Sequence, residues 1–203
     1  MSVEFLLVTL LIVASPGTGA IYTIVTGISS GGRASLWAAF ACMVGIIPHM
    51  LAAVLGLSAL LHANAVLYDA IKYAGAIYLI YMAVQSLRDQ STLRIEAKTK
   101  EWSVQTILTE GILINLLNPK LSIFFVAFLP QFVERDGGSP LVSMLWLSLV
   151  FMLVTVGVFA FYGLFAASLG DQLISKPVVM KWLRRSFAAS FAYIGVKLAL
   201  TDR

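Results

Sequence analysis

Residues 110–132 read EGILINLLNPKLSIFFVAFLPQF, an apolar segment that Asn118-Pro119-Lys120 interrupts near its middle. A second interruption, Ser15-Pro16-Gly17, lies in the apolar stretch from Val3 to Gly27, and the two prolines are 103 residues apart. A break in a hydrophobic helix frees backbone N–H and C=O groups that lipid cannot satisfy, so it persists only where protein or a water-filled cavity covers it. Breaks at corresponding places in two halves of a membrane protein indicate a transporter's substrate site. The paired breaks therefore predict a transporter.

Composition places the chain in a lipid bilayer. Hydrophobic residues make up 60% of its 203 residues, charged residues make up 12%, and the mean hydropathy is +0.91. Soluble domains are about half apolar and about a quarter charged. Several runs are apolar on all sides and have about the length that crosses a hydrocarbon core of roughly 30 Å. We therefore expect an all-α integral membrane protein. The single cysteine, Cys42, excludes a disulfide within the chain.

The apolar runs predict six membrane spans in one transmembrane domain, residues 1–203, with the first and fourth spans broken at Pro16 and Pro119. The spans are Val3–Gly27, Leu36–Leu61, Val66–Leu87, Gln105–Val133, Leu141–Leu169 and a short Phe187–Leu200. Three spans in each half make the second half enter the membrane in the opposite sense, which gives an inverted repeat. Repeat one is expected at 1–87, a cytoplasmic loop at 88–104 and repeat two at 105–203. A Gly-Gly turn follows each break, Gly31-Gly32 and Gly137-Gly138.

The distribution of lysine and arginine predicts the orientation. Nine of the fourteen lie in the first, third and fifth loops, four lie on the other side, and Lys120 lies within the membrane. Because positively charged loops stay in the cytoplasm, both termini are expected outside. The net charge of +4 reflects this bias. A nucleic-acid-binding protein would instead carry a basic face on a soluble module, and we expect no such partner.

The second break supplies the strongest candidates for a substrate site. Asn115 and Asn118 precede Pro119, and Lys120 follows it at a depth near the middle of the apolar run. The start of a half-helix carries a partial positive charge and favours a carboxylate or phosphate, and Lys120 adds a full charge. An ionisable residue within a membrane segment is a functional hypothesis by default. In the alternative, Asn-Pro is only a kink and Lys120 reaches the membrane interface.

The first break and the second span add further candidates. Pro16, Gly17 and Thr18 offer backbone N–H groups and one hydroxyl, and glycine lets the backbone approach a ligand closely. His49 lies near the centre of the second span and could carry a coupling proton, because histidine titrates near neutral pH. Equally, His49 could bond a carbonyl of a neighbouring helix.

Acidic side chains are scarce in the predicted spans. No carboxylate lies at the membrane centre, and no cluster of Asp, Glu, His or Cys indicates a metal site. Patterns such as His-Glu-x-x-His are absent, which leaves a membrane enzyme with few groups for catalysis. We therefore expect no bound metal, no cofactor and no enzymatic activity.

Several short motifs accompany the second break, of which Asn118-Pro119-Lys120 and Pro130-Gln131-Phe132 are the most specific. Five shorter motifs elsewhere in the chain are less specific: Ser15-Pro16-Gly17, Gly32-Arg33, Gly56-Leu57, Gly75-Ala76 and Tyr78-Leu79. With these motifs the chain resembles the lysine exporter (LysE) and homoserine/threonine resistance (RhtB) family of bacterial translocators. That family usually has Pro-Gly-Pro followed by a polar residue, often Asn, in the first break. In this chain Thr18, Gly19 and Ala20 follow Pro16-Gly17, so the second proline and the polar residue are both missing. The resemblance implies export of amino acids or related small metabolites, driven by the proton gradient.

The residues and the resemblance together predict a multi-pass exporter of the bacterial inner membrane that works by antiport. Its substrate is expected to be a small zwitterion in a central cavity, across which Gly17 faces Lys120. The carboxylate would meet Lys120 and the ammonium would meet helix-end carbonyls, with a homo-oligomer left open. One alternative is a non-transporting membrane scaffold, which has no use for Lys120. Another is a cation or metal exporter, which would need acidic, histidine or cysteine ligands.

Overall fold

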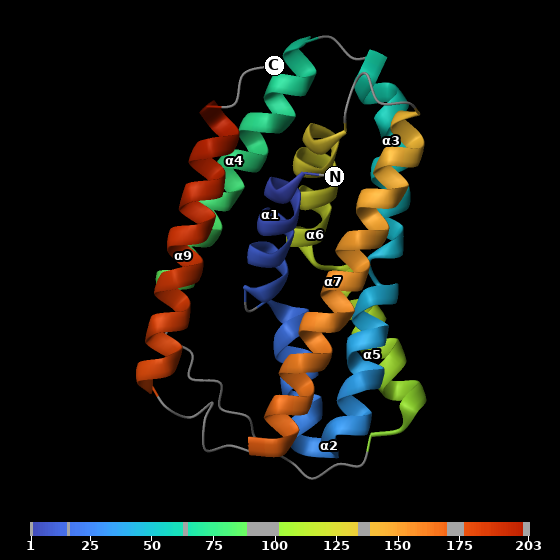
Figure 1. Cartoon of the computed structure of the whole chain (residues 1–203), viewed down its shortest axis with the longest axis vertical. Helices are drawn as coiled ribbons and strands as arrows, with labels where there is room; N and C mark the ends of the chain where they lie inside the picture. Colours follow the sequence, from blue (N-terminus) through green and yellow to red (C-terminus); the bar gives the residue numbers. More distant parts are fainter. Residues whose placement is uncertain are drawn as a thin grey trace.

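The chain is helical throughout the part that the structure, a computed structural model, describes: residues 2–15, 17–62, 65–88, 102–133, 139–169 and 177–200 (Figure 1). The helices are α1 (Val3–Ala14), α2 (Thr18–Val44), α3 (Ile47–His62), α4 (Ala65–Arg88), α5 (Val104–Leu116), α6 (Pro119–Ile123), η1 (Phe124–Phe128), η2 (Leu129–Phe132), α7 (Pro140–Leu169) and α9 (Pro177–Leu200). This agrees with the all-α prediction. Most of the predicted cytoplasmic loop at 88–104 lies outside the described residues.

The first predicted break separates α1 from α2. α1 ends at Ala14, and Ser15 has an extended backbone with φ −64° and ψ 129°. Gly17 is also extended, with φ −117° and ψ 179°, and no side chain caps the N-terminus of α2, which begins at Thr18. The first N–H groups of a helix have no partner within it, so this end of α2 presents free backbone donors. Pro16 itself lies outside the described residues.

The second predicted break separates α5 from α6, and the two parts of this broken helix are bent by 49°. Asn118 is extended and its side-chain oxygen accepts a hydrogen bond from the backbone N–H of Lys120 at 3.1 Å, so it caps α6. Pro119 takes the first helical position, where a missing N–H costs no hydrogen bond. α6 continues into η1, a π-helical turn, which is a rare form often found at functional sites.

α2 contains a kink at Gly31, where φ is +84° and ψ is 174°. A Cβ there would meet nothing within 4 Å, so the backbone conformation and not the space requires glycine. The predicted turn at Gly31-Gly32 is therefore observed as a kink, and α2 joins the end of the first predicted span to the start of the second. The corresponding pair Gly137-Gly138 lies outside the described residues.

The second predicted span, Leu36–Leu61, is divided between α2 and α3 by a turn at Gly45 and Ile46. Pro48 explains the position of this turn. A proline has no N–H and its ring collides with the carbonyl four residues earlier, which is that of Val44, the last residue of α2. Pro48 thus ends one helix and fits in the first turn of the next.

The last helix is longer than the sequence predicted. The apolar pattern gave a span of Phe187–Leu200, whereas α9 covers Pro177–Leu200, 24 residues. Its first half contains Lys181 and Arg184, which interrupt the apolar pattern but are good helix formers. At a rise of 1.5 Å per residue the helix is roughly 36 Å long, enough to cross a bilayer.

The two broken helices occupy the middle of the bundle. α1 and α6 lie side by side, with α4 and α9 on one side of them and α3 and α7 on the other (Figure 1). At one end, the ring of Phe5 on α1 packs on the ring of Phe132 in η2, with centroids 5.4 Å apart. At the other, the hydroxyl of Tyr22 on α2 donates to the carbonyl oxygen of Ile107 on α5 at 2.9 Å. Each half of one broken helix therefore contacts the opposite half of the other.

Glycines allow the helices around this centre to approach closely. A Cβ added to Gly27 on α2 would collide with the backbone of Gly163 on α7. A Cβ added to Gly45 would lie 2.7 Å from the carbonyl oxygen of Ile112 on α5. Small residues at such positions are typical of helix packing in membranes.

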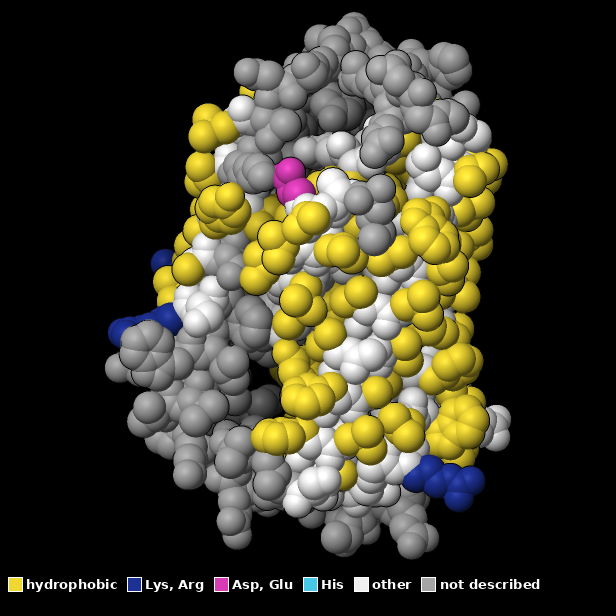
Figure 2. Space-filling model, viewed as in Figure 1, with side chains coloured by type: hydrophobic (Ala, Val, Ile, Leu, Met, Phe, Trp, Pro, Cys, Tyr) yellow, Lys and Arg dark blue, Asp and Glu magenta, His cyan; other side chains and the backbone are white. Residues whose placement is uncertain are grey.

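The outer surface is largely hydrophobic on the face that Figure 2 shows. α7 crosses this face in Figure 1, and its Trp146, Leu153 and Phe161 are 55%, 57% and 62% exposed. By length and composition, the segments Thr18–Gly56 and Pro140–Ser168 can cross a membrane. The bent pair α5 and α6–η2 is a third candidate span within the described ranges. This surface suits contact with lipid and not with water.

Candidate functional site

Lys120 reaches from the start of α6 to the end of α1. Its ammonium donates hydrogen bonds to the backbone carbonyls of Ile12 at 2.8 Å and Ser15 at 3.2 Å, and to the Ser15 hydroxyl at 3.0 Å. An ammonium has three N–H donors, so these acceptors match all of them. The C-terminal end of α1 also carries a partial negative charge that favours a cation. Lys120 is thus held within the protein core, and the alternative in which it reaches the membrane interface does not apply to this structure.

The two breaks meet at this lysine, in agreement with the expectation that Gly17 faces Lys120. A Cβ built on Gly17 would lie 3.0 Å from the Lys120 ammonium nitrogen. A further hydrogen bond ties α7 to the same place, because the hydroxyl of Tyr162 donates to the carbonyl oxygen of Ala14 at 2.8 Å. The last carbonyls of α1 are therefore satisfied by side chains from α6 and α7.

Asn115, near the end of α5, lies beside this contact and is 2% exposed. Its side-chain N–H donates to the carbonyl oxygen of Cys42 on α2 at 2.6 Å. Its side-chain oxygen, Oδ1, is buried and has no hydrogen-bond partner within the protein. That oxygen points at Gly19, since a Cβ there would lie 2.5 Å from it. A buried acceptor without a partner costs free energy, so Asn115 marks a place where a donor from a ligand or water would be stabilised.

His49 on α3 joins the two halves of the second broken helix. Its Nε2 lies 2.9 Å from the carbonyl oxygen of Asn115, at the end of α5, and its Nδ1 lies 3.1 Å from the hydroxyl of Ser122 on α6. A carbonyl only accepts, so Nε2 carries a proton and Nδ1 faces a hydroxyl that can either donate or accept. The carbonyl bond expected for a structural histidine is therefore present. The same geometry also accommodates a second proton on Nδ1.

A small cavity lies where these groups converge, and we call it the polar cavity. It is lined by Ile12, Val13, Gly17, Gly19, Ala20, Asn115, Asn118, Lys120, Leu121, Phe151, Thr155 and Phe159. About 10 Å³ is open to the centre of a water-sized sphere, which is room for roughly one water molecule. In this conformation the site is therefore closed around its polar groups.

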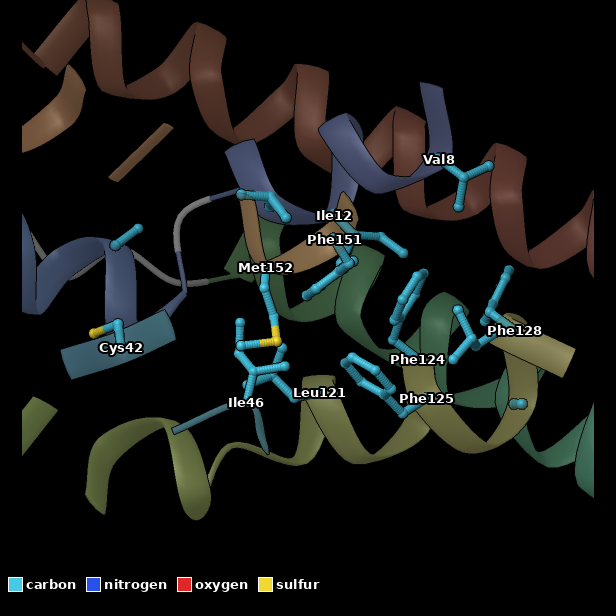
Figure 3. Packing of buried hydrophobic residues seen from close by; sticks show 14 of the residues in the cluster. Val8, Ile12, Cys42, Ile46, Leu121, Phe124, Phe125, Phe128, Phe151 and Met152 are labelled. Carbon is cyan, nitrogen blue, oxygen red and sulfur yellow. The ribbon is translucent and has the colours of Figure 1, made fainter. Parts of the chain in front are cut away.

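Phe151 lines the polar cavity from α7 and belongs to a wall of packed aromatic rings (Figure 3). The ring of Phe151 on α7 stacks on that of Phe124 with centroids 4.4 Å apart, and meets Phe125 edge-on at 5.3 Å. All three rings are at most 2% exposed. Such a dry wall strengthens hydrogen bonds and charge interactions in the cavity beside it.

Most of the candidates from the sequence gather at this place. Gly17, Asn115, Asn118 and Lys120 line the polar cavity, and His49 bonds the backbone of one of them. Thr18 and Pro119 begin α2 and α6, but their side chains are exposed and are not among the lining residues. Pro16 lies outside the described residues.

The sequence did not indicate the contribution of α7, which is a single apolar run. Phe151, Thr155 and Phe159 line the polar cavity from this helix, and Tyr162 bonds the end of α1. The signal that could have found part of this set is a hydroxyl inside a hydrophobic span, at Thr155 and Tyr162. Among the described residues, no group of three or more His, Cys, Asp or Glu side chains gathers at a distance suited to a metal ion.

The groups gathered here are hydrogen-bond donors and acceptors, which can bind ions and polar molecules. Free backbone donors at the start of α2 and the Lys120 ammonium suit an anion. The unpartnered oxygen of Asn115 and the helix-end carbonyls suit a cation or another hydrogen-bond donor. Together with the apolar outer surface, these features define a membrane protein with a polar site at the crossing of two broken helices.

Comparison with known sequences identifies the class. The family described as LysE type translocator matches residues 10–202, so the chain belongs to this family of membrane translocators and is not an enzyme. It is 32% identical over 199 residues to an uncharacterized membrane protein of Vibrio cholerae, covering 96% of this chain and 94% of that one.

Two similar proteins have names that describe an activity. The homoserine/homoserine lactone efflux protein of Salmonella typhimurium is 29% identical to this chain over 195 residues, which cover 96% of this chain and 94% of that protein. The leucine efflux protein of Klebsiella pneumoniae is 27% identical to this chain over 152 residues, which cover 74% of this chain and 72% of that protein. No solved protein structure matches the chain significantly.

Proposed function

We propose that this chain exports small zwitterionic amino acids, or closely related metabolites, across the bacterial inner membrane in exchange for protons. One observation carries the proposal: the unpartnered oxygen of Asn115 and the uncapped start of α2 share one buried cavity with Lys120. The names of the Salmonella and Klebsiella relatives, both efflux proteins for small amino-acid-like molecules, support the same substrate class.

The substrate's carboxylate is assigned to the start of α2. The backbone N–H groups that follow Gly17 have no side-chain cap, and the N-terminal end of a long helix favours an anion. The substrate's ammonium is assigned to the side-chain oxygen of Asn115, which otherwise has no donor. Asn118 lines the same cavity. Pro119 begins α6 and Thr18 begins α2, and Pro16 remains a candidate from its position in the sequence.

Lys120 changes partners in this proposal. In the closed conformation its ammonium binds the end of α1, so a carboxylate must compete with three acceptors for it. When substrate enters, Lys120 moves to the carboxylate and releases α1. The exchange links occupancy of the site to the position of α1, and alternating access requires such a link.

The architecture supports an inverted repeat of three plus three spans. We assign the first span to α1 with the first part of α2, and the second to the rest of α2 with α3. The third span is α4, the fourth runs from α5 to η2, the fifth is α7 and the sixth is α9. The cross-packing of the two broken helices, with Tyr22 on Ile107 and Phe5 on Phe132, is what a two-fold axis in the membrane plane would produce. The lysine and arginine distribution supports an orientation with both termini outside.

His49 is the candidate carrier of the coupling proton. Its Nδ1 can accept a proton without losing a hydrogen bond, because the hydroxyl of Ser122 at 3.1 Å turns from donor to acceptor. Export by wild-type protein in proteoliposomes should therefore rise as the external solution becomes more acidic, while His49→Gln should export slowly and without this dependence. If His49→Gln keeps the wild-type pH profile, the coupling proton travels elsewhere.

The export itself is tested by a metabolite profile of the culture medium. Cells that express the chain should accumulate one or more amino acids outside, compared with cells that carry an empty vector. Cells that express Lys120→Met at the same level in the membrane should match the empty vector. If the wild-type chain and the empty vector give the same medium under amino-acid overload, the proposed function is wrong.

A further inference from the structure

A second cavity lies on the other side of Lys120, and we call it the apolar cavity. Ile12 and Lys120 line both cavities. The other residues that line the apolar cavity are Tyr78, Leu79 and Met82 from α4, and Ile123, Phe124 and Phe128 from α6 and η1. About 10 Å³ is again open to the centre of a water-sized sphere. The side chain of Lys120 therefore stands between two small cavities of different character.

The lining residues determine what the apolar cavity can hold. Apart from the Tyr78 hydroxyl and the Lys120 ammonium, the side chains that line it are hydrocarbon, thioether or phenyl groups. Leu79, Phe124 and Phe128 are at most 4% exposed. A charged group placed there would lose its hydration without gaining a partner of opposite charge, which is costly. An aliphatic or aromatic group would be stabilised by about 25 cal/mol for each Å² of apolar surface removed from water.

Because Lys120 lines both cavities, a movement of its side chain would change both of them. Its ammonium is fixed on the end of α1 by hydrogen bonds of 2.8 to 3.2 Å, and this places its hydrocarbon stem between them. When the ammonium moves to a carboxylate in the polar cavity, the stem leaves this position. The two cavities then form one elongated site, polar at one end and apolar at the other.

We infer that the apolar cavity is the subsite for the substrate's side chain, and that the chain selects amino acids with uncharged, apolar side chains. This inference rests on the proposed function and names the substrate class for the same site. The carboxylate and ammonium bind at α2 and Asn115, and the side chain passes Lys120 to lie between α4 and η1. Met82 lines this subsite from α4, so we expect a change in its size to change which side chains fit.

Purified protein in proteoliposomes tests this subsite. The vesicles are loaded with equal concentrations of alanine, valine, leucine, methionine, phenylalanine, serine, aspartate and lysine, and a proton gradient is imposed. Efflux of each amino acid is then measured by mass spectrometry. For the wild type we expect efflux of the apolar amino acids to exceed that of aspartate and lysine by at least about tenfold, the effect of an unpaired charge in a dry pocket.

Variants of Met82 sharpen the test. Met82→Ala enlarges the subsite and should raise the efflux ratio of phenylalanine to alanine, whereas Met82→Phe fills it and should lower this ratio. Each shift should be about tenfold, the effect of one or two methylene groups in a hydrophobic pocket. Met43→Ala is the matched control, since Met43 is another partly buried methionine that lines neither cavity. Because ratios are compared, a smaller amount of folded variant does not alter the result.

The outcomes separate the two proposals. If the wild type releases none of the eight amino acids, the part of the proposed function that concerns these amino acids is wrong and the inference falls with it. If the wild type releases aspartate and lysine as fast as leucine, only the inference is wrong. The inference is also wrong if the wild type prefers apolar side chains but both Met82 variants keep its ratios, because the selecting subsite is then elsewhere.

Discussion

The two breaks have a similar backbone but different side chains. At the first, α1 ends in extended residues and α2 begins without a side-chain cap. At the second, Asn118 caps α6 and His49 bonds the carbonyl oxygen of Asn115. The second break therefore caps the start of α6 with a side chain of its own and receives one bond from His49 on α3, whereas the first has no cap of its own and depends on Lys120 and Tyr162 from other helices.

This difference shows how a repeated architecture can have one asymmetric site. The first break contributes bare backbone, which allows close approach of a ligand, and the second contributes the side chains that carry charge and hydrogen bonds. Removal of a side chain should therefore matter most at the second break. Addition of a side chain should matter most at the first.

The largest effect is expected from Lys120→Met, which keeps about the same side-chain length and removes the charge. Export should fall to the background of empty vesicles, because neither the end of α1 nor a substrate carboxylate then has its cation. The measurement is efflux from proteoliposomes with equal amounts of inserted protein. Leu117→Met is the matched control three residues away, since Leu117 is 76% exposed. Normal export by Lys120→Met would place the site elsewhere.

A smaller but still large effect is expected from Gly19→Ala at the first break. The new methyl group would lie 2.5 Å from the Asn115 oxygen and 2.9 Å from Phe159, so it fills the place assigned to the substrate's ammonium. Export should fall by at least about tenfold, the loss that a displaced hydrogen-bonded group produces. Gly157→Ala is the control, because a Cβ there meets nothing within 4 Å. Equal export by the two variants would contradict the assignment of the cavity.

Much of the fold could be predicted from the sequence because hydrophobic length and proline positions act locally. Both breaks, the kink at Gly31 and the helical class follow from single residues or short runs. The sequence did not predict the division of the second span, although Pro48 carried the signal, nor the full length of α9, because Lys181 and Arg184 masked a helix that remains continuous. Hydropathy measures the affinity of a segment for lipid, whereas backbone hydrogen bonds determine where a helix begins and ends. A hydropathy pattern therefore does not locate helix ends.

Part of the site could also be predicted from the sequence, because some of its residues stand out locally. Gly17, Asn115, Asn118 and Lys120 stand out as polar or flexible residues at a break. The roles of Phe151, Phe159 and Tyr162 did not follow from the sequence, because these residues belong to α7, whose uniform apolar run shows no preferred face. Which face of such a helix meets the cavity is decided by packing, and glycines such as Gly163 fix that packing across the chain.

The smallest effect is expected from Asn118→Ala, which tests whether the second break is capped by its own side chain. Loss of the bond from the Asn118 oxygen to the Lys120 N–H should lower the free energy of unfolding by about 1 kcal/mol, the usual contribution of an N-cap. Thermal unfolding in detergent measures this loss of stability.

Asn118→Ser can still cap the helix, so it should recover most of the stability. A measurement of export by the same variant then distinguishes two roles for the residue. If Asn118 only caps α6, Asn118→Ser restores export together with stability; if its amide also contacts substrate in the polar cavity, stability returns and export does not. A stability of Asn118→Ala equal to that of the wild type would show that the Asn118 cap contributes nothing to the second break, and the contrast in capping between the two breaks would disappear.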